Sequence, residues 1–582
     1  MSSNVQQEVV NTDQNSYEKG GSPTGNGHGK DTDPRGKEET SHGTFADGFD
    51  DDFNKSRVDA GGVSAGYERK VFLMNKIMQE EIGFGAWHWG LMLVAGLGWL
   101  IDNIWLQGVA IILPEVGKEF SDAVHTPWMT FALYIGLISG AAFWGIMADV
   151  VGRRFSFNAT LFIGGVFGIA AGGAPSFTAL GGMLAALGFG IGGSLPVDGM
   201  LFLEFIPGSH QYLLTFLSVF WAFGQLLASL VAWPLIDNYS CNGSNSAPIA
   251  NGPCDVALNM GWRYTFYTLG GFTMVCWIAR FFIFRLPESP KYLLFHGRDA
   301  EAIEVLRDIA GRCGKTIPED VLSLSILRSV AGEDTTVTEE DAIVKKRKGL
   351  GGMMDDAKAL PANLSKALGG KTKHEGGFLA HFKPLFATKK LAWQSSNLIF
   401  IWGLIGLAYP LYNAFLPSYL AARNGVSGSS GTNATYRDYA IISTCGIPGS
   451  IFAAWFVELP RSGRKGALAV STLITGVFVF ALTGAPNDAA YLALNCIAAC
   501  FQNMMYGVLY GYTPESFPAP VRGTGDGLCS SFNRITGLMA PVIKIYATGN
   551  VAAPLFCAGA IFCLAAIMSL FLTVETQGRS AM

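Results

Sequence analysis

Charged side chains are scarce in this chain of 582 residues: 15% are Asp, Glu, Lys or Arg, whereas 50% are hydrophobic. Soluble globular domains carry about 25% charged residues, so the composition excludes an ordinary soluble protein. The chain has no CxxC pair, no Cys/His spacing typical of a metal site, and no basic segment interleaved with aromatic residues. We therefore expect no metal, no cofactor and no nucleic-acid partner.

Catalytic motifs are missing as well. No nucleophile–base pair, metal-ligand cluster or phosphate-binding loop is recognisable, so we expect no enzyme activity. The glycines from Gly188 to Gly193 lie inside a long apolar run without a preceding strand. That context favours close helix packing over a dinucleotide-binding loop. No hydrophobic signal region opens the chain, so we expect a cytoplasmic N-terminus.

Long apolar segments are what the chain has in place of these features. Most of them reach the ~20 residues that a helix needs to cross a bilayer. They form two sets of six, which predicts an all-α membrane protein with about twelve transmembrane helices in two pseudo-symmetric halves. The segments are 88–113, 128–147, 157–175, 177–203, 212–236 and 264–285, then 393–418, 438–457, 467–485, 488–511, 527–547 and 551–573.

Polar segments separate these sets and define five regions. The positive charges concentrate on one side of the predicted membrane, which places both termini in the cytoplasm. Residues 67–82 are amphipathic, and we expect them to lie along the inner membrane surface. The predicted regions are a disordered cytoplasmic tail (1–66), a first six-helix half (67–285), a cytoplasmic loop with short helices (286–390), a second half (391–573) and a cytoplasmic tail (574–582).

The two halves repeat a basic turn and an acidic motif at one offset. Gly152 and Gly463 differ by 463 − 152 = 311 positions, and Arg153 and Arg464 keep that offset. Glu204-Phe-Ile-Pro207 corresponds at the same offset to Glu515-Ser-Phe-Pro518. Two unrelated basic turns would not share an offset with a second motif. The pattern indicates two similar halves in parallel orientation, as in many secondary transporters.

These motifs resemble the major facilitator superfamily. The resemblance is carried by Gly145-Ile-Met-Ala-Asp149-Val-Val-Gly152-Arg153-Arg154, by its echo at Glu458…Lys465, and by Pro287-Glu-Ser-Pro290. The segments 188–207 and 513–523 are similar to the fungal sugar-porter-like branch related to synaptic vesicle proteins. The resemblance covers about residues 85–579.

The resemblance implies a network of charges that closes the inner side of the transporter. Two positions depart from that branch. Leu184 stands where the branch usually has an arginine, which weakens the case for its membrane-embedded proton relay in this chain. Gln211 replaces a second arginine, so we expect a weaker lock in the first half. The residues assigned to the network are Asp149, Arg153, Arg154, Glu204, Glu458, Arg461, Arg464, Glu515 and Arg522.

Asp102 is the ionisable residue whose position most needs an explanation, because it lies in the middle of the first apolar segment. A charge at that depth costs roughly 2.5–3.5 kcal/mol on insertion scales. Facing an aqueous cavity it can take up and release a proton, so we assign it to proton coupling. The alternative is a neutral acid that is hydrogen-bonded for packing. Asp198, which follows Pro196, is the second candidate.

Arg534 keeps its charge at any working pH, so within a span it must face the cavity or pair with an acid. It can hold an anionic substrate or be the partner of Asp102, although a structural role near a helix end is a close alternative. Other polar and aromatic residues can bind a hydroxylated substrate, or else join helices through hydrogen bonds. Those assigned to substrate binding are Gln225, Tyr409, Tyr412, Asn413, Gln502, Asn503 and Tyr506.

The loop at about 237–262 is predicted to face outside. Its two cysteines, Cys241 and Cys254, can form a disulfide in that compartment. Asn238 and Asn242 in this loop, and Asn433 in another outer loop, begin glycosylation sequons.

A secondary active transporter of a small organic solute, a sugar, a carboxylate or a related metabolite, is the function that best fits these features. We expect proton-coupled uptake at the plasma membrane by a monomer. The fifth segment lacks the Gly-Pro-x-x-Gly-Gly pattern of the superfamily's drug antiporters, which favours import over export. The alternatives are an efflux transporter and a membrane sensor that binds solute without transporting it.

Overall fold

The computed structural model describes residues 64–120, 126–241, 254–284, 286–333, 382–420, 432–459, 462–517, 521–546 and 552–576. The predicted tail over 1–66 lies outside them except at residues 64–66. Most of the polar part of the central loop and the terminal residues 577–582 also lie outside. No strand occurs in the described part of the chain.

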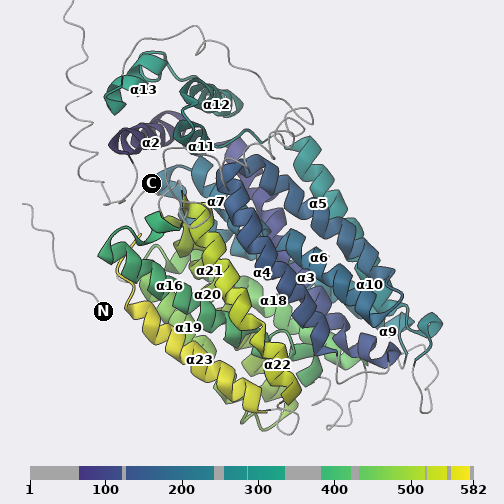
Figure 1. The fold of residues 1–582 in the computed structure, drawn as a ribbon. Coiled ribbons are helices and arrows are strands. Elements are labelled where there is room, and N and C mark those ends of the chain that lie inside the picture. The colour runs from purple at the N-terminus through teal and green to yellow at the C-terminus, as the bar shows by residue number, and fades with distance from the viewer. Residues whose placement is uncertain are drawn as a thin grey trace, which may run out of the picture. The chain divides into compact units, whose positions relative to one another are not determined.

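The first half consists of helices that run back and forth through one bundle (Figure 1). Two of its spans are interrupted, the fourth at Gly192–Gly193 and the fifth near Leu217. Its elements are α3 (Ala86–Glu119), α4 (Pro127–Val150), α5 (Arg153–Gly172), α6 (Phe177–Ile191), α7 (Ser194–Phe205), η2 (Gly208–His210), α8 (Tyr212–Phe216), α9 (Ser218–Tyr239), η3 (Val256–Leu258), α10 (Gly261–Ile278) and the π-helical η4 (Ala279–Ile283).

The second half repeats this arrangement. Its first helix begins at a cap in which the Thr388 hydroxyl accepts a hydrogen bond from the Leu391 N–H. The elements are η6 (Lys383–Phe386), α16 (Lys389–Tyr412), α18 (Thr432–Phe456), α19 (Gly463–Leu482), α20 (Asp488–Glu515), α21 (Arg522–Gly537), α22 (Met539–Tyr546) and α23 (Ala552–Leu570).

Eleven spans in the described residues are long and apolar enough to cross a membrane. The twelfth is formed by α21 and α22, which follow one another across Leu538. Its first part is polar because it carries Arg522, Asp526 and Arg534, all of them buried. The all-α fold with twelve transmembrane helices in two halves is thereby confirmed.

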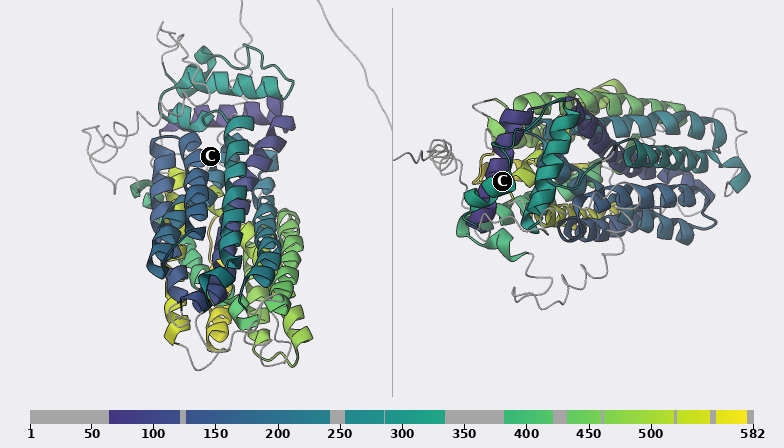
Figure 2. Two further views of the ribbon diagram at one scale, coloured as in Figure 1. Left: turned by 90° about the vertical axis from the view of Figure 1, so that its right-hand side faces the viewer. Right: turned by 90° about the horizontal axis from the view of Figure 1, so that it is seen from above.

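Two helix pairs make the most extensive contacts between the halves. α4 packs on α21, and α9 packs on α18. Figure 2 shows the bundle from two further directions. Within the first half, α4 and α6 approach closely at Gly188, where a side chain would overlap the Leu133 carbonyl oxygen.

Each half holds its basic turn in the same way. Gly152 adopts φ 127° and Gly463 adopts φ 57°, a region that favours glycine. Beyond the first turn, Glu288 accepts hydrogen bonds from the backbone N–H groups of Arg153 and Arg154. Beyond the second, Glu575 does the same for Arg464 and Lys465. A carboxylate therefore caps the start of α5 and of α19, where unpaired N–H groups favour a negative charge.

Short helices gather at one end of the bundle: α2 (Ala65–Ile77), α11 (Pro290–Phe295), α12 (Asp299–Arg312) and α13 (Leu324–Ala331) (Figure 1). The segment expected along the membrane surface forms α2 and the π-helical η1 (Met78–Ile82), and α2 packs on α11 and α13. Leu73 and Met74 are fully buried, and Lys70 Nζ lies 2.7 Å from Asp299 Oδ2. The apolar residues Leu73 and Met74 of α2 are therefore covered by protein.

Candidate functional site

Asp102 lies midway along α3 and is fully buried. Its Oδ2 accepts a hydrogen bond of 3.3 Å from the indole Nε1 of Trp221 on α9. Its Oδ1 lies 3.9 Å from Nη2 of Arg534 on α21. The two charges belong to different halves, so this ion pair bridges them in the middle of the bundle.

Arg534 is itself 4% exposed and lies well inside the span. Its Nη1 donates to the Ser530 hydroxyl one turn earlier on α21. The side chain thus points along its helix toward the centre of the molecule. Of the three roles left open by the sequence, the structure shows the pairing with Asp102, and it places Arg534 in the last turn of α21 but inside the span formed by α21 and α22; binding of an anionic substrate stays a prediction.

Aromatic rings surround this ion pair. The Trp221 ring centroid lies 5.9 Å from that of Tyr409 and 5.2 Å from that of Tyr506, which are 4.9 Å from each other. Tyr510 continues the cluster, 6.1 Å from Tyr506 and 4.6 Å from Trp402. Trp221 comes from the first half, and the other rings come from α16 and α20 of the second.

A small cavity opens next to these rings, about one helical turn beyond Asp102 along α3. It lies between α3, α4 and α16, and therefore between the two halves. Its lining is mostly apolar and includes Leu106, Gln107, Thr130, Leu133, Tyr134 and Tyr409.

The remaining residues assigned to substrate binding are engaged in bonds within or between the halves. Asn413 donates to Gln502 over 3.0 Å, and the Tyr412 hydroxyl donates to Asn495 over 2.7 Å. Both bonds join α16 to α20 within the second half. Asn503 donates to the Ala499 carbonyl of its own helix. Gln225 is buried on α9, where it lies close enough to bond to Tyr439 of α18.

Asp198 forms a second buried ion pair, with Arg280 of η4. Both side chains are completely buried. The guanidinium carbon of Arg280 lies 3.0 Å from the centroid of the Phe157 ring. Gly98 of α3 leaves the space that the Asp198 carboxylate occupies, because a Cβ at this position would collide with Oδ2.

Sequence reasoning missed Arg280, although the signal was present. An arginine inside the predicted span 264–285 needs a counter-charge by the same argument that singled out Asp102. It also missed Asp526, which lies fully buried on α21 two turns before Arg534.

The charges predicted to close the inner side form one cluster in each half. Arg153 lies 3.3 Å from Asp149 and 3.1 Å from Glu204. In the second half, Arg464 lies 2.6 Å from Glu515 and 3.7 Å from Glu458. The Arg153–Glu204 and Arg464–Glu515 pairs are therefore equivalent at the shared offset of 311 positions, whereas Asp149 and Glu458 do not correspond at that offset.

Arg522 and Glu515, both assigned to this network, lie at the inner end of the second half. Arg522 Nε donates to the Pro514 carbonyl over 2.8 Å, while the ion pair of Glu515 is with Arg464. The backbone N–H of Arg154 donates to Glu288. Arg461 lies outside the described residues.

One contact of this region crosses between the halves. The backbone N–H and the hydroxyl of Thr524 on α21 both donate to Asp149 Oδ2 on α4, each over 2.8 Å. Asp149 thus joins the cluster of the first half to the second half and closes the inner end of the boundary.

Other contacts cross the boundary at the outer end. Gln107 of α3 donates to the Tyr409 hydroxyl over 2.9 Å and accepts a bond from the Tyr439 hydroxyl. The Tyr436 hydroxyl donates to the Ile111 carbonyl over 3.3 Å. The aromatic cluster and its ion pair are therefore enclosed between contacts on both sides.

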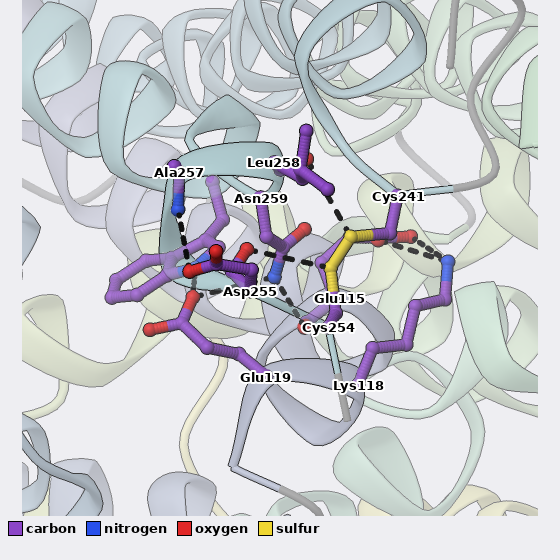
Figure 3. The surroundings of a disulfide bond; sticks show 10 residues. Glu115, Lys118, Glu119, Cys241, Cys254, Asp255, Ala257, Leu258 and Asn259 are labelled. Atoms are coloured by element: carbon purple, nitrogen blue, oxygen red, sulfur yellow. Dashed lines mark hydrogen bonds and ion pairs between the residues drawn. A yellow bond between two sulfur atoms is a disulfide. The ribbon is translucent and has the colours of Figure 1, made fainter. Parts of the chain in front are cut away.

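A disulfide joins Cys241 to Cys254 at the outer end of the first half (Figure 3). The N–H of Cys254 donates to the Lys118 carbonyl at the end of α3. Nearby, Glu119 accepts bonds from Trp262 over 2.8 Å and from Arg263 over 2.5 Å. The side chains of Asn238 and Asn433 are exposed, and Asn242 lies outside the described residues.

Comparison with known proteins agrees with this architecture. The family profile described as Major Facilitator Superfamily matches residues 89–541. The chain is 45% identical over 522 residues to the "MFS siderochrome iron transporter 1" of Ceriporiopsis subvermispora, covering 90% of this chain and 94% of the relative. It is 27% identical to the "Niacin transporter NiaP" of Acinetobacter baylyi, with 80% and 88% coverage.

A solved structure shares the fold at low sequence identity. It is the proton:xylose symporter XylE bound to 6-bromo-6-deoxy-D-glucose, with a TM-score of 0.61 and 17% identity. The match covers 85% of this chain and 98% of the other. Helix arrangement, family profile and close relatives agree, and the chain belongs to the Major Facilitator Superfamily of membrane transporters.

Proposed function

We propose that this transporter takes up a small organic solute together with a proton by alternating access. The observation that carries the proposal is the Asp102–Arg534 pair, which bridges the two halves at the centre of the bundle. A carboxylate is stable there while it faces the arginine and much less stable after that partner leaves. Protonation of Asp102 is therefore linked to any event that occupies Arg534 or separates the halves.

Alternating access requires the two ends of the boundary to open in turn. At the inner end, the Asp149–Thr524 bonds would have to break before α4 and α21 separate. At the outer end, the Gln107–Tyr409 bond would have to break. We assign the clusters around Arg153 and Arg464 to stabilising the inner-closed arrangement. Asp149, which pairs with Arg153, is also the acceptor of the Thr524 bonds across the boundary.

Further assignments accompany this proposal. We propose that the protein functions as a monomer in the plasma membrane and carries glycans at Asn238, Asn242 or Asn433. Asp198 is the second candidate for the proton if Asp102 does not carry it. Its full burial and its pairing with Arg280 support a structural role more strongly.

The test uses purified full-length protein in proteoliposomes. A pH gradient, acidic outside, should drive accumulation of a labelled substrate above its external concentration. Solute counterflow should also occur when no pH gradient is applied. A sensor would bind without counterflow, and an exporter coupled to proton entry would expel solute under the same gradient. Either result would reject the proposal.

A further inference from the structure

The rings around Asp102 and Arg534 have a composition that restricts the ligand. Trp221, Tyr409, Tyr506 and Tyr510 are all buried and contact one another through their faces and edges. Flat ligands match such surfaces, since offset-stacked and edge-to-face ring pairs contribute beyond the area that they bury. The adjoining cavity adds the apolar side chains of Leu106 and Leu133 to this surface.

The positive charge of Arg534 calls for a negative charge on the ligand, which a neutral ring does not supply. Its charge is permanent, and Asp102 is the acid with which it forms an ion pair. The separation of 3.9 Å is an ion-pair distance without a direct hydrogen bond, so guanidinium donors stay available on that side. When Asp102 takes up a proton, the buried guanidinium loses this counter-charge, and a ligand carboxylate can replace it in a two-pronged pair.

Other titratable groups face this pair from each neighbouring helix. They are Tyr134 on α4, Tyr506 and Tyr510 on α20, Asp198 on α7 and Asp526 on α21. The tyrosines remain neutral at working pH. Asp198 is held by Arg280, and Asp526 lies two turns from Arg534 toward the inner end. Asp102 is thus the acid that directly competes with a ligand for Arg534.

Polar groups that would recognise a sugar are largely occupied. Asn413 is bonded to Gln502, Tyr412 to Asn495, and Gln107 to Tyr409 and Tyr439. A polyhydroxylated ligand would have to break several of these bonds. A planar acid needs Arg534 and the ring faces alone.

We propose that the substrate is a planar aromatic or heteroaromatic monocarboxylate, bound through its carboxylate to Arg534 while Asp102 is protonated. This inference rests on the proposed proton-coupled uptake and specifies its substrate. One proton on Asp102 and one negative charge on the ligand enter together, so the translocation step moves no net charge. Proton and ligand bind cooperatively. Protonated Asp102 no longer competes with the ligand carboxylate for Arg534, and a carboxylate bound to Arg534 removes the positive charge that disfavours protonation of Asp102.

The test is uptake of labelled nicotinate and benzoate into proteoliposomes under a pH gradient, with empty vesicles as background. Cyclohexanecarboxylate has the same charge without a planar ring, and nicotinamide has a planar ring without the charge. At least one planar acid should be concentrated, and both comparison compounds should compete about tenfold more weakly or worse. A potassium-diffusion potential should not change the rate.

Point variants test separately the charge of Arg534 and the aromatic ring of Tyr506. Arg534→Gln should abolish uptake of the planar acid, whereas Arg437→Gln, at an exposed arginine on α18, should not change it. Tyr506→Phe should retain uptake and Tyr506→Leu should reduce it about tenfold. Thermal stabilisation by nicotinate or benzoate, measured on the same preparations, should be lost in Arg534→Gln. The ligand-free variant should still unfold in a cooperative transition, which shows that it is folded.

Two results would overturn the inference. Proton-driven accumulation of a neutral sugar or another non-aromatic solute, with neither planar acid transported, would reject the substrate class and leave the proposed function standing. Potential-driven uptake of a planar acid would reject the shared use of Arg534. Absence of gradient-driven uptake for every compound, with counterflow intact, would instead reject proton coupling itself.

Discussion

The carboxylate of Asp102 and the guanidinium of Arg534 face each other across the boundary between the two halves, with Oδ1 3.9 Å from Nη2. In this arrangement Asp102 is fully buried and Arg534 is 4% exposed. Opening the boundary at either end separates or hydrates the pair. The charge state of the centre is therefore linked to which end of the transporter is closed.

Asp198 and Arg280 should behave as a structural pair. Asp198→Asn leaves Arg280 as an uncompensated buried charge, which should lower the free energy of unfolding by about 3–5 kcal/mol. The double variant Asp198→Leu/Arg280→Met removes both charges and should recover most of the lost stability. Thermal unfolding in detergent compares the three proteins. A stable Asp198→Asn protein that has lost proton-driven uptake would show instead that Asp198 carries the proton.

Thr524 should control how often the inner end opens. Thr524→Val removes the hydroxyl that donates to Asp149, a bond to a charged group worth about 1.5–3 kcal/mol. The population of inward-open protein should rise about tenfold or more. Spin labels on Ser209→Cys and Lys390→Cys, with the exposed Cys557 replaced, report the separation of the inner ends.

Thr536→Val is the matched control on the same helix, because that hydroxyl donates to carbonyl groups of α21 itself. Its distance distribution should equal that of the parent protein. Equal distributions for Thr524→Val and Thr536→Val would show that the Asp149–Thr524 contact does not hold the inner end closed.

Lys291 on α11 should make the inner helices sensitive to pH. Burial, followed by repulsion from Arg522, lowers the pKa of this lysine from 10.5 to about 7. Between these values an exposed lysine binds a proton that the buried one does not, so the buried arrangement gains stability as the pH rises from about 7 toward 10.5. Below pH 7 the buried group is protonated as well, and this stability is absent.

Hydrogen exchange of the peptides that cover α2 and α11 should therefore show weaker protection at pH 6.5 than at pH 8.5, after correction for intrinsic rates. The Tyr67 hydroxyl of α2 donates to the Lys291 carbonyl, which couples the two helices. Lys291→Met should remove the difference between the two pH values. Burial also lowers the pKa of His296 below its usual range, so His296 titrates under this window. A pH effect that survives in Lys291→Met would contradict the assignment.

Hydrophobic patterning and repeated motifs were sufficient to predict the fold. Segment length alone indicates a membrane span, and a shared offset of 311 positions relates Gly152 to Gly463 without any contact information. The caps at Glu288 and Glu575 were not predicted, because these two residues are not related to each other by that offset. The docking of α2 was not predicted either, because an amphipathic face does not show whether lipid or protein covers it.

The candidate site was predictable residue by residue but not as an arrangement. An acid or arginine inside an apolar span calls for a partner, which singled out Asp102, Asp198 and Arg534. Which partner each finds depends on how the helices are placed around one another. The pairing of Asp198 with Arg280, and the gathering of Trp221 and Tyr506 beside Asp102, come from helix packing that sequence periodicity does not encode.

The most direct test of the account is transport by Asp102→Asn, which keeps the shape of the side chain but removes its titration. In proteoliposomes with an acidic exterior, the wild-type protein should concentrate a transported solute and the variant should only equilibrate it. Exchange of labelled for unlabelled solute should continue in the variant at much the same rate, because the binding site and the alternation remain. If Asp102→Asn still concentrates solute in response to the pH gradient, Asp102 does not couple proton to solute, and the central claim is wrong.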